Sequence, residues 1–321
     1  MDILIVTGPT GVGKSSFVDK FAQTVPSEIV NIDVGQLYAP LRIGTAKPDL
    51  TGVTEPHHLF DLLDEPRSLT VTEYRRRLRE IVEDVLQRGR LPILVGGSGF
   101  YINSLFFPPQ AVRPVQDSRE TTLDDDSSGD LWDQLYKIDP VRAGQIHRHD
   151  TYRINRALDI WKQEKVLPSQ CKPIFDPIAS AVIAFVGRDR PELYNRINAR
   201  THEMIGEGWI EEVKKLQGTS WEPFLRHKKL IGYDDIFQYL DMPELERDQE
   251  VLIELIQKRT RHYAKRQCAY NSMLIKKLDA QNSSDILIQE INLSQSPSLI
   301  NFEKLLVALN KQKKERSNGN K

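Results

Sequence analysis

The chain has 321 residues, of which 39% are hydrophobic and 28% charged, enough for a substantial core and for about two domains. Its formal net charge of −1 excludes a protein that is basic over its whole surface but leaves room for a local basic face. Cys171 and Cys268 lie far apart without metal-ligand spacing, which argues against a zinc finger or a disulfide framework. No apolar run approaches the roughly 18 residues of a membrane span and no leader is visible, so we expect a cytoplasmic protein without membrane contact.

The first hundred residues alternate between strand and helix patterns. Residues 2–7 read as a buried strand, followed by a Gly-rich turn and a helix over 15–25. A second strand is expected over 28–34, a helix with apolar spacing over 72–88, and a continuous apolar strand over 91–97. This order predicts an α/β fold with a parallel sheet of the phosphate-loop type, flanked by helices.

The character of the chain changes after residue 107. A polar, acidic stretch over 111–130 precedes two or three helices over 132–165, and a core strand resumes at Ala181. Two helical segments follow, over 190–216 and from a start near Pro243 to residue 278. We therefore expect a catalytic core over 1–107 and 179–310, a helical insertion over 108–178 and a disordered tail over 311–321.

Residues 8–15, GPTGVGKS, match the phosphate-loop pattern between a strand and a helix. The main-chain N–H groups of such a loop converge on phosphate oxygens, and the helix N-terminus adds partial positive charge. Lys14 supplies a point charge and Ser15 a hydroxyl suited to Mg²⁺. The predicted phosphate-binding residues are Gly8, Thr10, Gly11, Val12, Gly13, Lys14 and Ser15.

Nucleotide hydrolases of this class usually carry a second strand that ends in an acidic residue for Mg²⁺. Here the strand over 91–97 runs into Gly96-Gly97-Ser98-Gly99, without such a carboxylate. The missing carboxylate disfavours a kinase or hydrolase. Asp33, at the end of the second strand, is the nearest candidate to bind Mg²⁺ or to accept a proton, although a turn-capping role is also open.

Two basic stretches are candidates for contact with a polyanion, although such runs are more often solvated helix surface. In the insertion, Arg153 and Arg156 lie three residues apart, next to Tyr152. The last long helix concentrates six basic side chains in nine residues. They are Lys258, Arg259, Arg261, His262, Lys265 and Arg266. In a chain of neutral net charge, this concentration favours contacts with a phosphate backbone.

Taken together, these stretches resemble the tRNA dimethylallyltransferases, also called tRNA isopentenyltransferases. The likeness covers roughly residues 3–275. It depends on the phosphate loop and on seven further motifs in order: ID-x-x-QLY from Ile32, IGTAKP from Ile43, PHHL-x-D from Pro56, ILVGGSGFY from Ile93, the DP-x-x-A run from Asp139 to Leu158, IGY from Ile231 and TRHYAKRQ from Thr260. Only the stretch 108–130 is shorter than the family leads us to expect.

The resemblance implies transfer of a dimethylallyl group from dimethylallyl diphosphate to N6 of adenine 37 in the tRNA anticodon loop. It implies Mg²⁺ as cofactor, a monomer, Asp33 as the base, and an adenine that leaves the anticodon stack for a pocket between the domains. The implied tRNA-binding residues are Asp33, Val34, Gly35, Gln36, Ser98, Tyr152, Arg153, Arg156, Lys229, Gly232, Tyr233, Lys265, Arg266 and Gln267.

The chain departs from the family pattern at three places that the resemblance assigns to tRNA contact. Val34 and Gly35 follow the catalytic aspartate where Ser is common, Asp234 follows the IGY motif where a basic residue is frequent, and Tyr270 stands in the position of a Trp. Three other functions stay open: prenyl transfer to a free adenine nucleotide, a phosphate-loop kinase or hydrolase, and an inactive RNA-binding protein. We expect an active enzyme with altered RNA contacts.

Overall fold

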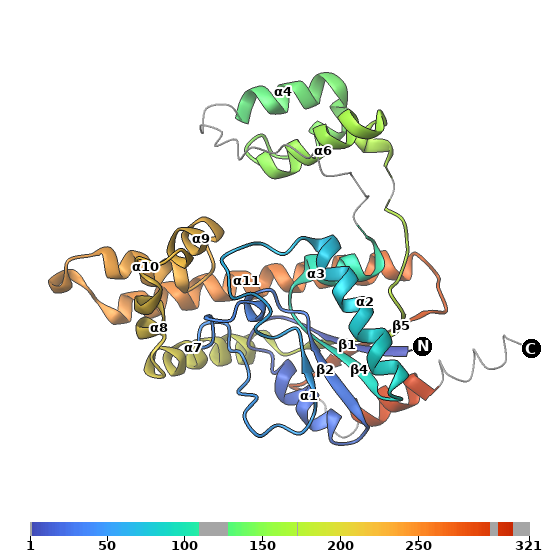
Figure 1. Ribbon diagram of the computed structural model, residues 1–321, viewed down its shortest axis with the longest axis horizontal. Coiled ribbons are helices and arrows are strands. Elements are labelled where there is room, and N and C mark those ends of the chain that lie inside the picture. The colour runs from blue at the N-terminus through green and yellow to red at the C-terminus, as the bar shows by residue number, and fades with distance from the viewer. Residues whose placement is uncertain (1, 109–127, 172, 296–300, 311–321) are drawn as a thin grey trace, which may run out of the picture. The chain divides into compact units, whose positions relative to one another are not determined.

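The computed structural model describes residues 2–108, 128–171, 173–295 and 301–310 (Figure 1). It divides into two compact units, one made of residues 1–106 and 177–321 and the other of residues 107–176. The shortening predicted within 108–130 falls mostly on residues outside the described ranges, and the disorder predicted for 311–321 falls entirely outside them. Among the described residues, no helix is both long and apolar enough to cross a membrane.

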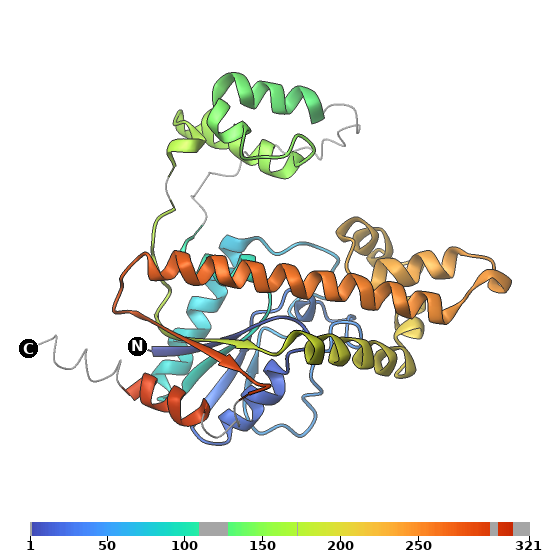
Figure 2. The same ribbon diagram turned by 180° about the vertical axis from the view of Figure 1, so that it is seen from behind.

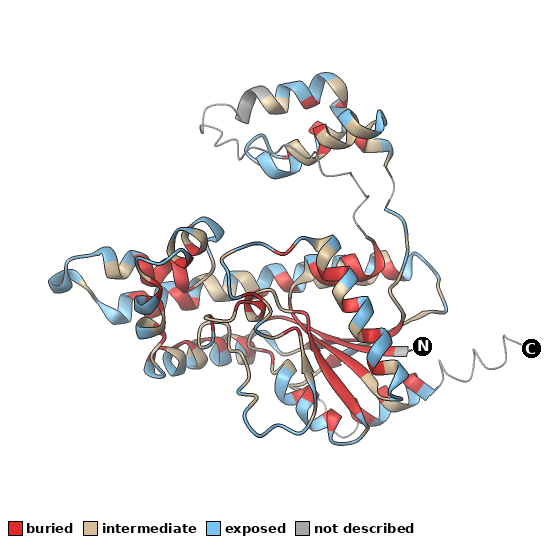
Figure 3. Ribbon diagram, viewed as in Figure 1, coloured by how far each residue is buried: buried red, intermediate tan, exposed pale blue. Residues whose placement is uncertain are grey.

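The first unit is built on a parallel sheet of six strands in the order β3-β2-β4-β1-β5-β6, which confirms the predicted α/β fold. The strands are β1 (Asp2–Thr7), β2 (Ser27–Asn31), β3 (His57–His58), β4 (Leu91–Gly96), β5 (Ser180–Gly187) and β6 (Ile286–Asn292). The central strands are continuously apolar and buried, as strands covered on both faces require (Figure 3). The sequence patterns did not reveal β3 and β6, the two edge strands.

Helices cover both faces of this sheet. The helices of the first unit are α1 (Lys14–Ala22), α2 (Val71–Gln87), α3 (Gly99–Phe106), α7 (Arg190–Gly206), α8 (Trp209–Leu216), α9 (Trp221–Lys228), α10 (Tyr233–Asp241) and α11 (Gln249–Asp279), with a further helix over 301–310 and short 3-10 turns η1 (Gly35–Leu37) and η3 (Glu244–Glu246). Of these, α8, α9 and α10 lie to one side of the sheet (Figure 1). The 301–310 helix packs against α1, where the ring of Phe302 meets the edge of Phe17 at a centroid distance of 5.1 Å. Figure 2 shows α11 as the longest helix, which runs past the sheet as one unbroken rod.

Two helix boundaries differ from the sequence prediction. The helical stretch expected over 190–216 is split into α7 and α8 by Gly208, which has a φ of +99°. The last long helix begins later than expected, because the Asp248 side chain accepts from the N–H groups of Glu250 and Val251 and so caps α11 there.

The second unit is a small helical body. It contains α4 (Ser128–Ile138), α5 (Pro140–Ala143), α6 (Thr151–Glu164) and the 3-10 turn η2 (Pro168–Gln170). Its core includes Leu135, Ile154 and Leu158. Buried Asp139 accepts from the N–H groups of Arg142 and Ser169, which joins α5 to η2.

Candidate functional site

The phosphate loop joins the end of β1 to the start of α1. Gly11 and Gly13 have φ values of +77° and +99°, which side chains disfavour, and Gly13 is the N-cap of α1. At Gly8 a Cβ would lie 2.1 Å from the carbonyl oxygen of Val186, so the loop passes very close to β5. These glycines place the first N–H groups of α1 at the carboxyl edge of the sheet, where they can bind an anion.

Lys14 is held within the loop by main-chain oxygens. Its Nζ donates to the carbonyl oxygens of Gly8 at 3.0 Å and Pro9 at 2.9 Å. Burial lowers the pKa of Lys14 to about 8, while the nearby Asp33 acts in the opposite direction and Arg200 adds to the shift. An anion bound here would favour the charged form of the Lys14 ammonium, so this loop is suited to bind phosphate.

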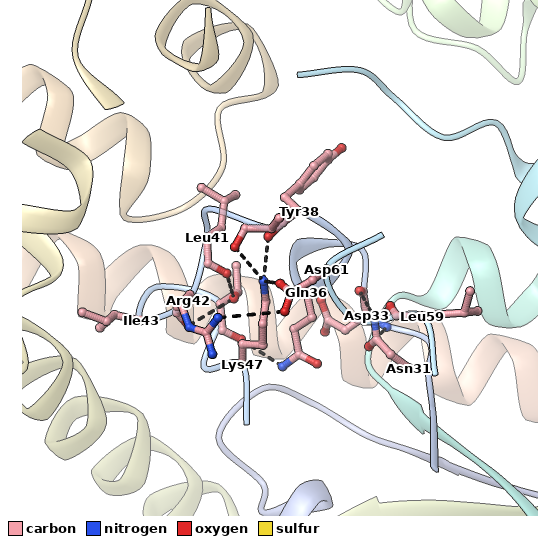
Figure 4. Close-up of polar contacts among 12 residues, drawn as sticks. Asn31, Asp33, Gln36, Tyr38, Leu41, Arg42, Ile43, Lys47, Leu59 and Asp61 are labelled. Atoms are coloured by element: carbon pink, nitrogen blue, oxygen red, sulfur yellow. Dashed lines mark hydrogen bonds and ion pairs between the residues drawn. The ribbon is translucent and has the colours of Figure 1, made fainter. Parts of the chain in front are cut away.

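Asp33 comes two residues after β2, and its main chain is held on both sides by the buried side chain of Asn31. The Asn31 Oδ1 accepts from Asp33 N at 2.8 Å, and its Nδ2 donates to Asp33 O at 3.0 Å and to Leu59 O at 2.9 Å (Figure 4). The Asp33 carboxylate accepts from Gly35 N at 3.0 Å and lines the same cavity as Lys14. The carboxylate is therefore held in a defined orientation beside the phosphate loop.

Ser98 and Gln36 also line this cavity, and both have partners within the protein. The Ser98 hydroxyl accepts from Val34 N at 3.1 Å, which joins the end of β4 to the residue after Asp33. The Gln36 amide donates to the carbonyl oxygens of Thr45 and Ala46, both at 3.1 Å. These contacts fix the wall of the cavity next to the carboxylate.

Lys47, from the IGTAKP motif, anchors the loop that contributes Thr45 and Ala46 to this wall. Its side chain is only 1% exposed and pairs with Asp61, and its Nζ donates to Tyr38 O at 2.7 Å (Figure 4). The carboxylate of Glu212, on α8, accepts from Arg42 N at 3.0 Å and from Ile43 N at 2.8 Å. The loop around residues 42–47 is thus held in place by Lys47 and Glu212, both of which already have partners within the protein.

The cavity has a volume of about 780 Å³, large enough for a diphosphate and a base together. Its lining residues all belong to the first unit. The predicted residues among them are Thr10, Gly11, Gly13, Lys14, Ser15, Asp33, Val34, Gly35, Gln36, Ser98, Lys229 and Arg266. Residues separated by more than 200 positions in the chain therefore meet at one place.

The sequence reasoning missed three arginines that follow β5 and approach the phosphate loop. Arg188 Nε donates to Val12 O at 2.8 Å, and Arg196 Nε donates to Gly11 O at 3.0 Å. Arg200 lies one turn beyond Arg196 on α7 and lines the cavity, where burial lowers its pKa and Asp33 counteracts the shift. The signal available in the sequence was the spacing of Arg196 and Arg200, which lie four residues apart and therefore on one face of the helix after a core strand.

The basic run on α11 is only partly free to meet a polyanion. Arg259 pairs with Asp235 and lies 3.7 Å from Asp234, and Arg261 donates to Asn198 at 2.6 Å. These two arginines therefore stabilise contacts of α11 with α10 and α7, so only part of the predicted basic run can meet a polyanion. Lys265 and Arg266, by contrast, are exposed, and Arg266 borders the cavity.

Gln267 does not face solvent as a direct tRNA contact would require. Its side chain is buried, its Oε1 accepts from Thr10 N at 2.8 Å, and its Nε2 donates to Gly97 O at 2.8 Å. The expectation of direct RNA contact at this position is corrected, because both ends of the amide already bind the protein.

The IGY motif also has a different role from the expected one. Gly232 has a φ of +84°, and Tyr233 is fully buried with its hydroxyl donating to Glu212 at 2.6 Å. Asp234, which departs from the family pattern, is buried and accepts from Gln238 at 3.1 Å. Gly232 and Tyr233 are therefore corrected to packing residues, whereas Lys229 lines the cavity.

The insertion carries the other predicted tRNA-binding residues on α6. Tyr152 is 72% exposed, and Arg153 is exposed with its Nε 3.2 Å from Asp150. Arg156 lies one turn further along the same helix and is half-buried. The exposed ring and the two arginines lie within four residues of one another, as the sequence predicts for a helix surface.

The described residues contain no cluster of three or more His, Cys, Asp or Glu side chains that could hold a metal ion by themselves. His57 and His58 belong to β3, where His58 binds Glu28 at 2.7 Å and His57 binds Glu55 O at 2.7 Å. Ser15, at the start of α1, and the Asp33 carboxylate are two of the oxygen donors that border the cavity, which is also lined by the carboxylates of Asp19 and Glu203. This set fits an Mg²⁺ ion that takes most of its ligands from a phosphate and from water.

Comparisons with known proteins identify the family. Residues 36–273 match the family described as IPP transferase. The tRNA dimethylallyltransferase of Pseudothermotoga lettingae is 36% identical over 271 residues, which are 83% of this chain and 85% of the relative. The tRNA dimethylallyltransferase of Geobacter sulfurreducens is 33% identical over 280 residues, covering 84% of this chain and 88% of the relative.

Two solved structures share the fold. The full-length tRNA isopentenylpyrophosphate transferase of Bacillus halodurans is 27% identical, with a TM-score of 0.65 over 99% of this chain and 98% of the other. A eukaryotic dimethylallyltransferase acting on tRNA is 25% identical, with a TM-score of 0.75 over 90% of this chain and 73% of the other. The chain described here therefore belongs to the IPP transferase family, whose curated members at this level of identity are named tRNA dimethylallyltransferases.

Proposed function

We propose that this protein transfers a dimethylallyl group from dimethylallyl diphosphate to N6 of adenine 37 in tRNA, with release of diphosphate. Membership of the family supports this function. The observation that carries it is that Lys14 of the phosphate loop and the carboxylate of Asp33 line one cavity of about 780 Å³. One end of this cavity suits a diphosphate and the other a nucleophile that must lose a proton.

At the diphosphate end, positive groups are concentrated where a leaving group would need them. The N–H groups of the phosphate loop, Lys14 and the half-buried Arg200 would stabilise the charge that develops on the departing oxygen. Arg188 and Arg196 bind main-chain oxygens of the loop, so they orient it. Mg²⁺ bound near Ser15 would neutralise part of the diphosphate charge.

At the acceptor end, Asp33 is the group able to remove the proton. As N6 of adenine attacks the first carbon of the prenyl chain, the bond from that carbon to the diphosphate oxygen breaks and the oxygen keeps the electron pair. The N6 proton passes to the Asp33 carboxylate, which Asn31 and Gly35 hold in place. Gln36 and Ser98 lie next to it and would border the adenine.

Two surfaces would hold the rest of the tRNA. Lys265 and Arg266 on α11 are exposed beside the cavity, and the insertion offers Tyr152, Arg153 and Arg156 on α6. Arginine and lysine suit the phosphate backbone and an exposed tyrosine suits an unstacked base. A free adenine nucleotide would need no such surface, which disfavours the alternative of prenyl transfer to a nucleotide. We also propose a cytoplasmic monomer.

A kinase or hydrolase is the other alternative, and the end of β4 disfavours it. Residues after this strand are Gly97 and Ser98, and no carboxylate follows to hold Mg²⁺ against a nucleotide. In addition, the carboxylate of Asp33 stands beside the loop, where a base for an amine is needed. An inactive RNA-binding protein is disfavoured because Lys14, Ser15 and Asp33 are all present.

The test is transfer to an anticodon stem-loop with adenine at the target position, measured by mass spectrometry of the digested nucleosides. We expect isopentenyl-adenosine with dimethylallyl diphosphate and Mg²⁺, and no ADP from ATP. Asp33→Asn keeps the size of the side chain but removes the base, so we expect a loss of turnover of about 10²-fold or more with nearly unchanged tRNA affinity. Near-normal turnover of Asp33→Asn would contradict the assignment of the base.

A further inference from the structure

Gln267 connects three parts of the site that are far apart in the sequence. It lies on α11 directly after Lys265 and Arg266, yet its side chain turns inward and is only 6% exposed. Its Oε1 accepts from Thr10 N in the phosphate loop, and its Nε2 donates to Gly97 O beyond the end of β4, both at 2.8 Å. The two partners lie 257 and 170 positions away in the sequence.

The chemistry of the amide fits these partners in one orientation only. An N–H donor lies opposite the amide oxygen and a carbonyl acceptor lies opposite the amide nitrogen, so rotating the amide would leave both unsatisfied. Because the group is buried, such a loss is costly. A leucine cannot replace either bond and a glutamate can replace only one of them when ionised.

The surroundings of Gly97 support the same conclusion. A Cβ at Gly97 would lie 2.5 Å from the Gln267 Nε2 and 3.1 Å from Gly8 O, so the absence of a side chain is what admits the amide. Gly97 is also next to Ser98, whose hydroxyl accepts from Val34 N beside the catalytic carboxylate. One amide therefore borders both the diphosphate loop and the acceptor side of the cavity.

We propose that Gln267 is a positioning residue that sets the phosphate loop for the diphosphate and couples α11, which carries Lys265 and Arg266, to that loop. The inference rests on the proposed function and deepens it, because it assigns to this residue the diphosphate end of the reaction instead of direct contact with tRNA.

The experiment separates the two ligands. Affinity for inorganic pyrophosphate with Mg²⁺ is measured by calorimetry without tRNA, and affinity for an anticodon stem-loop is measured by filter binding without diphosphate. We expect Gln267→Leu and Gln267→Glu, at pH 8, to weaken pyrophosphate binding about tenfold or more while stem-loop affinity and its salt dependence stay as in the wild type. Gly97→Ala, which displaces the amide from its partner, should resemble Gln267→Leu.

The pH dependence of Gln267→Glu provides a signature that general loss of structure would not produce. A protonated carboxyl has an acceptor oxygen and an O–H donor, so it can accept from Thr10 N and donate to Gly97 O as the amide does. Burial and the facing carbonyl raise the pKa of this introduced carboxyl group, whereas the Lys14 ammonium, which also lies beside Gly97, and the Tyr263 hydroxyl, which bonds the Gln267 side chain, act in the opposite direction. Its pyrophosphate affinity, divided by that of the wild type, should therefore recover as the pH falls from about 8 toward 5.5, with no such recovery in Gln267→Leu.

Two results would overturn the proposal. One is a loss of stem-loop affinity with unchanged pyrophosphate affinity, which would make Gln267 a tRNA contact. The other is an equal loss of both affinities together with a lower unfolding temperature and no recovery at low pH, which would make it a packing residue. Pyrophosphate binding requires no transfer, so this test stands apart from the turnover test of the proposed function.

Discussion

Lys14 and Asp33 line the same cavity, and the charge of Asp33 affects the pKa of Lys14. Burial lowers the pKa of Lys14 to about 8, and the Asp33 carboxylate limits that shift. A lysine in this state costs the ligand-free protein stability, because its ammonium is poorly solvated and its Nζ has only two main-chain oxygens as partners. The diphosphate is the group that would offset this cost.

We therefore expect the affinity of the ligand-free protein for pyrophosphate to fall as the pH rises through about 8, the pKa of Lys14. Only the charged ammonium attracts the anion, so binding above this pH requires uptake of a proton, and the affinity should fall up to about tenfold per pH unit. Calorimetry in buffers with different ionisation enthalpies would measure the proton uptake. Lys14→Met reports the titration of pyrophosphate itself, and an equally steep fall in that variant would contradict the assignment.

At the scale of elements, Gly44 and Gly232 allow a loop and a turn to pack closely against a helix. A Cβ on Gly44 would lie 2.1 Å from Trp209 Nε1, and a Cβ on Gly232 would lie 2.0 Å from Trp209 Cη2. Trp209 begins α8 and is 3% exposed, between the loop after Tyr38 and the turn before α10. Glu212, on the same helix, binds both the loop amides and the Tyr233 hydroxyl.

Gly44→Ala should therefore lower the free energy of unfolding by about 1–3 kcal/mol, since the added Cβ would overlap the indole of Trp209 and force it to shift. It should also weaken transfer, because Gly44 and Thr45 line the cavity. Urea unfolding measures the first effect. Gly206→Ala is the matched control, because a Cβ there meets nothing within 4 Å, and it should be neutral or slightly stabilising. If Trp209→Phe does not recover part of the loss in the double variant, the clash with the indole is not the cause.

At the scale of the whole molecule, a chain of net charge −1 must bind a polyanion through a few local positive groups. Many of its arginines are already paired within the protein, including Arg259 and Arg261 on α11. This leaves Lys265 and Arg266 as the exposed pair next to the cavity. The salt dependence of tRNA binding should therefore depend strongly on a small number of side chains.

Lys265→Ala should weaken tRNA binding at low salt and reduce the slope of log K against log salt by about one. Its effect on pyrophosphate affinity should be small, because the side chain is exposed on α11. Lys304→Ala removes an equally exposed lysine from the 301–310 helix, which packs with α1, and should leave the slope unchanged. Equal slopes for the wild type and Lys265→Ala would rule out a phosphate contact by Lys265.

Local patterns were sufficient for much of the fold. The apolar strands β1, β4 and β5 and the amphipathic helix α2 follow from periodicity, because a buried parallel strand and a helix stripe each have their own spacing. The edge strands β3 and β6 were missed. β3 has only two residues, and β6 starts with Ile-Leu-Ile but continues with Gln, Glu and Asn around a single Ile, so neither carries an apolar signal over its whole length.

The sequence by itself determined the phosphate loop, Asp33 and the family, because these depend on short motifs whose residue types the chemistry requires. Only the tertiary structure decided what the residues near the C-terminus do. Gln267 and Tyr233 follow or belong to motifs that suggest tRNA contact, yet their side chains are buried against Thr10 and Glu212. Arg200 carried no motif, yet it lines the cavity. The physical reason is that the direction of a side chain is set by what packs around it, and those partners lie up to 257 positions away in the chain.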